Sequence, residues 1–218
     1  MTCWARGLGG CSTKLSREHY VTAALFGDDA RVTVQGFSWC KEAPKEIGLT
    51  SATAKILCRK HNSDLSPVDV AGLAGFQGLA EFHRLHGVRV ALAPRRWAVR
   101  RRTLDGFGLE RWFAKTAVNL AVLHPTMLRW PSGAGIDEPP VEQLRAVFGV
   151  GPFEAPAGLY MVGATGGHVQ AARTVTFAPL LRGSTFCGGI FGFYGHRFVL
   201  SFLAEPLPSD LGGVSEAV

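Results

Sequence analysis

The chain has 218 residues, of which 47% are hydrophobic and 18% charged, and its Lys and Arg residues outnumber Asp and Glu by 23 to 17. This length and composition exclude a chain too polar to fold, and they allow one large domain or two small ones with a buried core. The formal net charge of +6 favours a polyanionic partner, either nucleic acid or an anionic membrane surface, without choosing between them.

Residues 1–10, MTCWARGLGG, do not have the basic start and apolar run of a secretory signal, so we expect a cytoplasmic protein. Five cysteines in such a chain favour metal binding over a disulfide framework. The most apolar stretch, residues 185–204, is as long as a membrane span, but it contains His196, Arg197 and several glycines. We therefore expect a two-stranded hairpin turning at residues 194–196, and no membrane partner.

Short segments broken by Gly, Ser and Asp make up the first seventy residues. β-Branched alternation predicts a strand over residues 31–39, and residues 41–48 are typical of a loop. A helix is expected over residues 50–65, capped by Thr50, Ser51 or Thr53 and stopped by Ser66-Pro67. The order expected for this part is β-β-α.

Helices are predicted next, over residues 68–92, 107–124 and 139–149. In the first of these, apolar residues recur at a spacing that predicts one buried face: Leu73, Phe76, Leu79, Phe82 and Leu85. Strands are expected after residue 151, over residues 158–163 and 173–181 and in the hairpin.

The expected fold class is α+β, divided into four segments. These are a ββα module over residues 1–70, a helical segment over 71–150, a β-rich segment over 151–205 and a frayed tail over 206–218.

Cys58 and His61 have the spacing C-x-x-H, which brings a thiolate and an imidazole to one side of a helical turn, where a tetrahedral zinc ion can join them. Cys3 and Cys11, on either side of a Gly-rich stretch, are the candidates for the other two ligands, with Cys40 as a substitute for Cys3. The alternative is that Cys58 is a buried apolar residue and His61 a solvated one.

Glu18-His19 lies between these two pairs, and the order Cys…Cys, acidic-His, C-x-x-H-Asn resembles the HNH, or ββα-metal, superfamily of nucleases in its zinc-stapled branch. Residues 15–26, 36–41, 47–69 and the segment LERWFAKT are similar to bacterial proteins described as HNH-endonuclease-like. The motif covers residues 3 to about 69, close to a third of the chain.

The resemblance implies a role for each residue of the motif. His19 would be the general base in phosphodiester hydrolysis, and Glu18 and Asn62 would hold a catalytic Mg²⁺ or Mn²⁺ ion. A structural zinc ion would be held by four residues: Cys3, Cys11, Cys58 and His61. Two departures matter, since the family more often has Asp at the position of Glu18, and His61 could instead be the closing histidine that binds the catalytic cation.

Residues 94–102, PRRWAVRRR, form a second candidate site. Arginine binds phosphate with two hydrogen bonds and tryptophan can stack on a base, so a nucleic-acid contact is expected from six residues: Arg95, Arg96, Trp97, Arg100, Arg101 and Arg102. The alternative is a solvated basic loop held to the core by Trp97.

The sequence thus predicts a metal-dependent endonuclease that hydrolyses the phosphodiesters of DNA. One alternative is a non-catalytic zinc-binding module that holds nucleic acid or a protein. The other is a nuclease subunit of a defence or toxin system that needs a partner chain or a second copy of itself.

Overall fold

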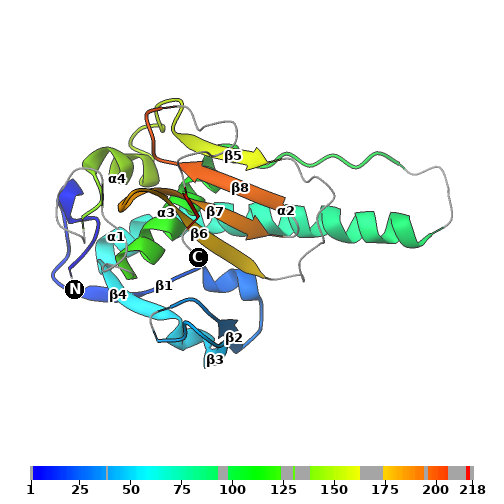
Figure 1. The fold of residues 1–218 in the computed structure, drawn as a ribbon, viewed down its shortest axis with the longest axis horizontal. Coiled ribbons are helices and arrows are strands. Elements are labelled where there is room, and N and C mark those ends of the chain that lie inside the picture. The colour runs from blue at the N-terminus through cyan, green and yellow to red at the C-terminus, as the bar shows by residue number, and fades with distance from the viewer. Residues whose placement is uncertain are drawn as a thin grey trace.

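The computed structural model describes residues 2–37, 39–92, 98–123, 130, 138–162, 174–193, 196–205 and 215–216. Two small sheets near the N-terminus lie beside a pair of central helices, and a larger sheet covers the other side of these helices (Figure 1). The architecture is therefore a mixture of helix and sheet, in agreement with the expected α+β class.

Among the residues that the structure describes, all strand pairs are antiparallel. The small sheets pair β1 with β4 and β2 with β3, and the large sheet has the order β5-β8-β7-β6-β9. The strands are β1 (Leu15–His19), β2 (Arg31–Val34), β3 (Lys45–Gly48), β4 (Thr53–Cys58), β5 (Gly158–Val162), β6 (Val175–Arg182), β7 (Thr185–Phe193), β8 (His196–Ser201) and β9 (Ser215–Glu216).

Four α-helices and three short 3-10 helices complete the described part of the chain. They are α1 (Arg59–Asp64), α2 (Ser66–Ala91), α3 (Gly106–Leu123) and α4 (Val141–Val147), with 3-10 turns at Arg6–Leu8, Ala23–Phe26 and Leu49–Ser51. The three helices expected after residue 66 are confirmed within a few residues at each end.

The helix expected over residues 50–65 is wrong in its first half. Residues 53–58 form β4, which pairs with β1, and the backbone N–H of Trp4 donates to the Ile56 carbonyl at 3.0 Å. This pairing, together with the burial of Ile56 and Leu57, favours a strand over the helix suggested by local spacing. Residues 45–48, expected in a loop, form β3, and the strand expected over 31–39 ends at Val34.

Helix α2 packs closely on α3 through glycines spaced three residues apart. A Cβ atom at Gly72 would lie 2.2 Å from Cδ1 of Trp112, and one at Gly75 would lie 2.8 Å from Cδ1 of Leu109. The apolar face expected to reach Leu85 does not stay buried, because Phe82 is 39% exposed. The outer half of α2 extends beyond the sheet, as Figure 1 shows.

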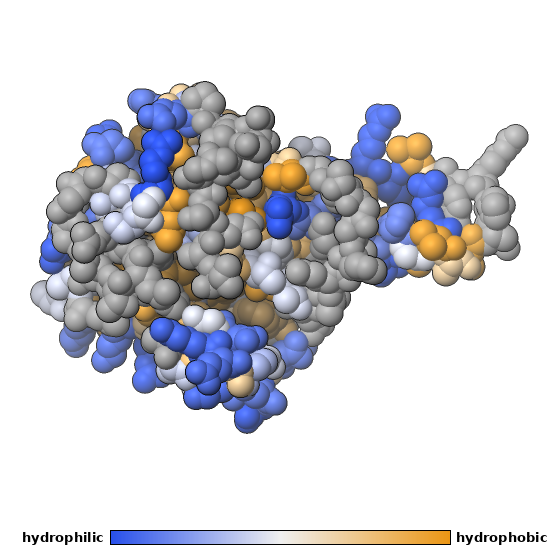
Figure 2. Space-filling model, viewed as in Figure 1, coloured by the Kyte–Doolittle hydropathy of each residue, from blue (hydrophilic) through white to orange (hydrophobic). Residues whose placement is uncertain are grey.

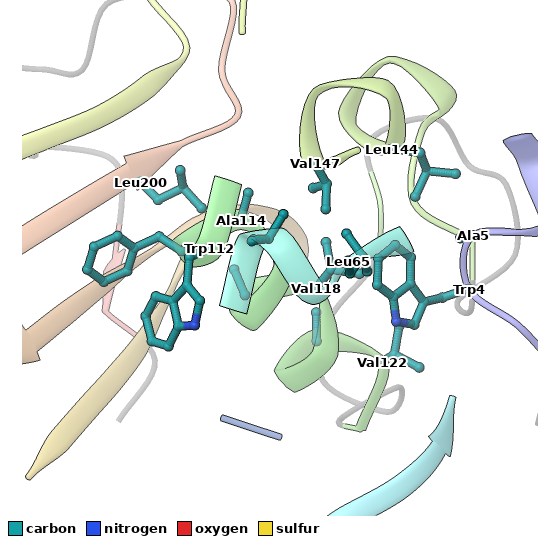
Figure 3. Packing of buried hydrophobic residues seen from close by; sticks show 14 of the residues in the cluster. Trp4, Ala5, Leu65, Trp112, Ala114, Val118, Val122, Leu144, Val147 and Leu200 are labelled. Atoms are coloured by element: carbon teal, nitrogen blue, oxygen red, sulfur yellow. The ribbon is translucent and has the colours of Figure 1, made fainter. Parts of the chain in front are cut away.

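One hydrophobic cluster joins the N-terminal strands, the helices and the large sheet. Figure 3 shows Trp112 and Leu200 at one end of the packing and Trp4 and Leu144 at the other. Helix α2 continues through the expected boundary between residues 70 and 71. The described contacts do not test the division of the chain into four segments, which stays a prediction.

The hairpin expected within residues 185–204 is confirmed, since β7 and β8 pair from Gly188–Ser201 to Phe193–His196. No α-helix in the described ranges combines the length and the apolar character needed to cross a bilayer.

Candidate metal centre

Four side chains from two separate parts of the chain converge at one point. Cys3 precedes the 3-10 turn Arg6–Leu8, and Gly9 and Gly10 follow it with φ of 75° and 66°. Glycine adopts this left-handed conformation at little steric cost, and it turns the chain back so that Cys11 returns toward Cys3.

The other two side chains come from the junction of β4 and α1. Cys58 is the N-cap of α1, and its sulfur accepts a hydrogen bond from the backbone N–H of His61 at 3.5 Å. This cap orients the first helical turn so that the His61 imidazole and the Cys58 sulfur lie on the same side. The C-x-x-H spacing therefore brings the Cys58 sulfur and the His61 imidazole together, as the sequence predicts.

The distances among these groups suit a tetrahedral ion. Nδ1 of His61 lies 3.4 Å from the Cys3 sulfur, 3.6 Å from Cys11 and 3.4 Å from Cys58. Zn–S bonds of about 2.3 Å and Zn–N bonds of about 2.05 Å at a tetrahedral angle place S and N about 3.5 Å apart. All four ligand atoms lie within 4.8 Å of one another, so these residues are close enough to hold a metal ion.

The surroundings shift the pKa values of the three thiols by different amounts and in different directions. Burial raises the pKa of Cys3 to about 12. Burial also acts to raise the pKa of Cys58, but hydrogen bonds from the His61 backbone and from Ser12 outweigh it and lower the value to about 7. Burial raises the pKa of Cys11. Cys58 is thus the thiol most easily converted to the thiolate that a metal requires.

Packing in the core holds the fourth candidate ligand, His61, in place. His61 is 3% exposed, and its ring packs edge-on against Phe148 at a centroid distance of 5.4 Å. A surface hollow of about 600 Å³ lies over the site, lined by Gly9, Lys60, His61 and Arg145 among others. The ligand set is therefore fixed by packing and still reachable from solvent.

Glu18, expected to hold a catalytic cation, is 6% exposed and already has a cationic partner. Its Oε1 lies 2.7 Å from Nζ of Lys115 and accepts a longer hydrogen bond, 3.4 Å, from the Asn119 amide. Burial raises the pKa of Glu18, and the Lys115 ammonium opposes this shift. Lys115 occupies the oxygen that a divalent ion would bind, so no contact among the described residues supports the Mg²⁺ or Mn²⁺ role expected for Glu18.

His19, the expected general base, ends β1 and is half-buried. Burial is the main cause that lowers its pKa, the Lys115 charge lowers it further and Asp69 acts against both. A lowered pKa leaves the imidazole neutral at neutral pH, which is the form that accepts a proton.

Asn62 connects α1 to β1. Its amide Nδ2 donates to Oγ of Ser16 at 3.0 Å and to the carbonyl of Arg17 at 3.3 Å. Asn62 therefore contacts the strand that carries Glu18 and His19. The contact uses its amide nitrogen, whereas binding a cation would use its amide oxygen.

Protein families, curated proteins and solved structures give no match to this chain. The functional assignment consequently depends on the geometry of the residues themselves.

Only part of the predicted basic site can be placed. Arg95, Arg96 and Trp97 lie outside the described residues. Arg100, Arg101 and Arg102 are exposed, and Arg102 pairs with Glu81 of α2 at 2.9 Å. Basic and apolar side chains lie together on the projecting part of the molecule (Figure 2). Val90, near the end of α2, is 73% exposed, and Val99 is 80% exposed.

Sequence reasoning missed the polar network around Glu18. Lys115 and Asn119 contact Glu18 directly, Asp69 joins through Lys115, and Thr22 joins through Asp69. A signal for two of them was present, because α3 is apolar on nearly all sides and must be buried. A Lys and an Asn inside such a helix need polar partners elsewhere in the chain.

Proposed function

We propose that this chain is a zinc-stapled nucleic-acid hydrolase of the ββα-metal type. The observation that supports it most is the tetrahedral spacing of Cys3, Cys11, Cys58 and His61. Zinc fits this donor set because three thiolates and one imidazole are typical of its structural sites. The ion would fasten the N-terminal segment to the start of α1, and so fix β1 against β4.

The lowered pKa of His19, at the end of β1, supports its role as the general base. The neutral imidazole takes a proton from a water molecule, the water oxygen attacks phosphorus, and the P–O bond to the leaving nucleoside breaks. The leaving oxygen then takes a proton from solvent. Asn62 orients this site by holding β1 on α1, and the exposed arginines of residues 100–102 supply phosphate contacts.

One observation favours a second candidate function, a zinc-stapled module that binds nucleic acid without cleaving it. The Glu18 carboxylate, which the resemblance assigns to a divalent ion, is engaged by Lys115. A module without that ion would keep the zinc site and the basic surface and would lose catalysis.

Replacing His19 separates the two candidates. With plasmid DNA or RNA in Mg²⁺ or Mn²⁺, we expect the wild type to cleave and His19→Ala to lose at least about 100-fold in rate, with zinc content unchanged. His86→Ala, an exposed histidine of α2, is the matched control and should cleave normally. A His19→Ala variant as active as the wild type excludes the proposed base, and binding without cleavage by either protein favours the second candidate.

The pH profile of cleavage follows from the same residue. Only the neutral imidazole accepts a proton, and the pKa of His19 is lowered from its ordinary 6.5. The rate should therefore fall as the pH is lowered, with a midpoint below pH 6.5, as His19 becomes protonated.

The basic surface makes a separate prediction about binding. Arg100→Ala with Arg101→Ala should weaken nucleic-acid binding at all sequences and reduce the slope of log K against log salt by about 1.8, since each lost phosphate contact releases about 0.9 fewer counterions. Arg31→Ala with Lys41→Ala, an equal change of charge in and after β2, is the control. Equal slopes for the two double variants, measured by fluorescence anisotropy, would contradict the assigned surface.

A further inference from the structure

The carboxylate network around Lys115 joins three elements at the inner side of β1. Nζ of Lys115, on α3, lies 2.7 Å from Oε1 of Glu18 on β1, and 2.7 and 2.8 Å from the two oxygens of Asp69 on α2. Lys115 is 2% exposed. An ammonium group has three N–H bonds, and three carboxylate oxygens lie within hydrogen-bond distance of it.

The remaining contacts of these carboxylates also come from N–H and O–H donors. Thr22 donates its hydroxyl to Asp69 at 2.6 Å and accepts a hydrogen bond from the Trp112 indole at 2.7 Å. Asn119 donates to Glu18 and, at 3.3 Å, to the backbone carbonyl of His19. Donors arranged in this way satisfy negative charge without a metal ion.

A divalent ion on Glu18 would meet the ammonium on the same oxygen. Mg²⁺ binds carboxylate oxygen at about 2.1 Å and demands near-octahedral ligands, so it would lie close to a full positive charge in a buried site where charges are weakly screened. The ammonium and the ion therefore exclude each other at this position.

We propose that Lys115 is the built-in cation of this site, standing between Glu18 and Asp69 where the resemblance expects a divalent ion. Lys115 neutralises the two carboxylates and holds β1 on α2 and α3, and so acts as a positioning residue for His19. The functional part of this inference rests on the proposed hydrolase, whereas the exclusion of metal from Glu18 does not.

The test measures Mn²⁺ binding to the zinc-loaded protein. Electron paramagnetic resonance monitors the concentration of free Mn²⁺ during the titration. The wild type and Lys115→Arg, which keeps a positive charge, should bind no Mn²⁺ through Glu18. Lys115→Ala should have a lowered thermal midpoint that Mn²⁺ raises again, with a new Mn²⁺ site that the additional change Asp69→Asn removes. A pKa of His19 that rises in metal-free Lys115→Ala, measured by NMR, would distinguish positioning by charge from packing alone.

Two results would overturn the inference. The first is a Mn²⁺ site in the wild type that Glu18→Gln abolishes. This measurement does not depend on whether Lys115→Ala folds. The second is a folded Lys115→Ala that binds no Mn²⁺. Because neither readout requires cleavage, a protein that cleaves nothing but shows the expected Mn²⁺ pattern would refute the proposed hydrolase and leave the exclusion of metal from Glu18 by Lys115 intact.

Discussion

Cys58→Ala is expected to lose the zinc ion and to lower the free energy of unfolding by about 4 kcal/mol or more, because loss of a structural metal is among the largest effects of a single substitution. At about 2–4 °C per kcal/mol for a chain of this size, the thermal midpoint should fall by about 8–16 °C. Elemental analysis should find one zinc in the wild type and none in the variant.

The reason is that this ion would join the N-terminal stretch directly to the start of α1, two segments that lie far apart in the chain. Cys3 and Cys11 lie on an N-terminal stretch fixed to β4 by the Trp4–Ile56 hydrogen bond, and zinc affinity in such sites is itself folding free energy. A strong chelator should reproduce the effect, since Cys11 is exposed and His61 lines the hollow above the site.

Cys40→Ala is the matched control, because Cys40 is 4% exposed but does not belong to the ligand group. This substitution should lower the free energy of unfolding only as much as the loss of any buried sulfur does, and the variant should keep its zinc. A wild type whose thermal midpoint is unchanged by chelation, or a Cys58→Ala that retains a full equivalent of zinc, would refute the zinc site.

Gly72→Ala is expected to destabilise the protein, although alanine is the better helix former. The added Cβ would lie 2.2 Å from Cδ1 of Trp112, a ring buried in the core and hydrogen-bonded to Thr22. Forcing the two helices apart should cost about 1–3 kcal/mol beyond the helix gain. The displaced ring would also disturb the Thr22–Asp69 hydrogen bond.

The same substitution at Gly87 provides the comparison on the same helix. A Cβ there meets nothing within 4 Å among the described atoms, so Gly87→Ala should stabilise by up to about 1 kcal/mol through helix propensity. Urea unfolding of both variants measures the difference. A Gly72→Ala protein as stable as Gly87→Ala would mean that α2 and α3 are not in close contact.

The C-x-x-H ligand pair could be predicted from the sequence because it is local. Cys58 and His61 are three residues apart, and any tight turn or helix start brings their side chains to one side. The helices after residue 66 were predictable for a similar reason, since their apolar periodicity and their proline and glycine boundaries lie within each segment. The strand at residues 53–58 could not be predicted in this way. Its apolar residues have the spacing of a helix, and only pairing with β1 makes the segment a strand.

The sequence by itself predicted the four residues of the candidate metal centre, the central helices and the hairpin of residues 185–204. Only the tertiary structure decided the partner of Glu18, because Lys115 and Asp69 are 97 and 51 residues away in the chain and meet it through packing of three elements. The cost of burying a charge without a partner explains why such groups come together, but no local pattern names which residues will meet.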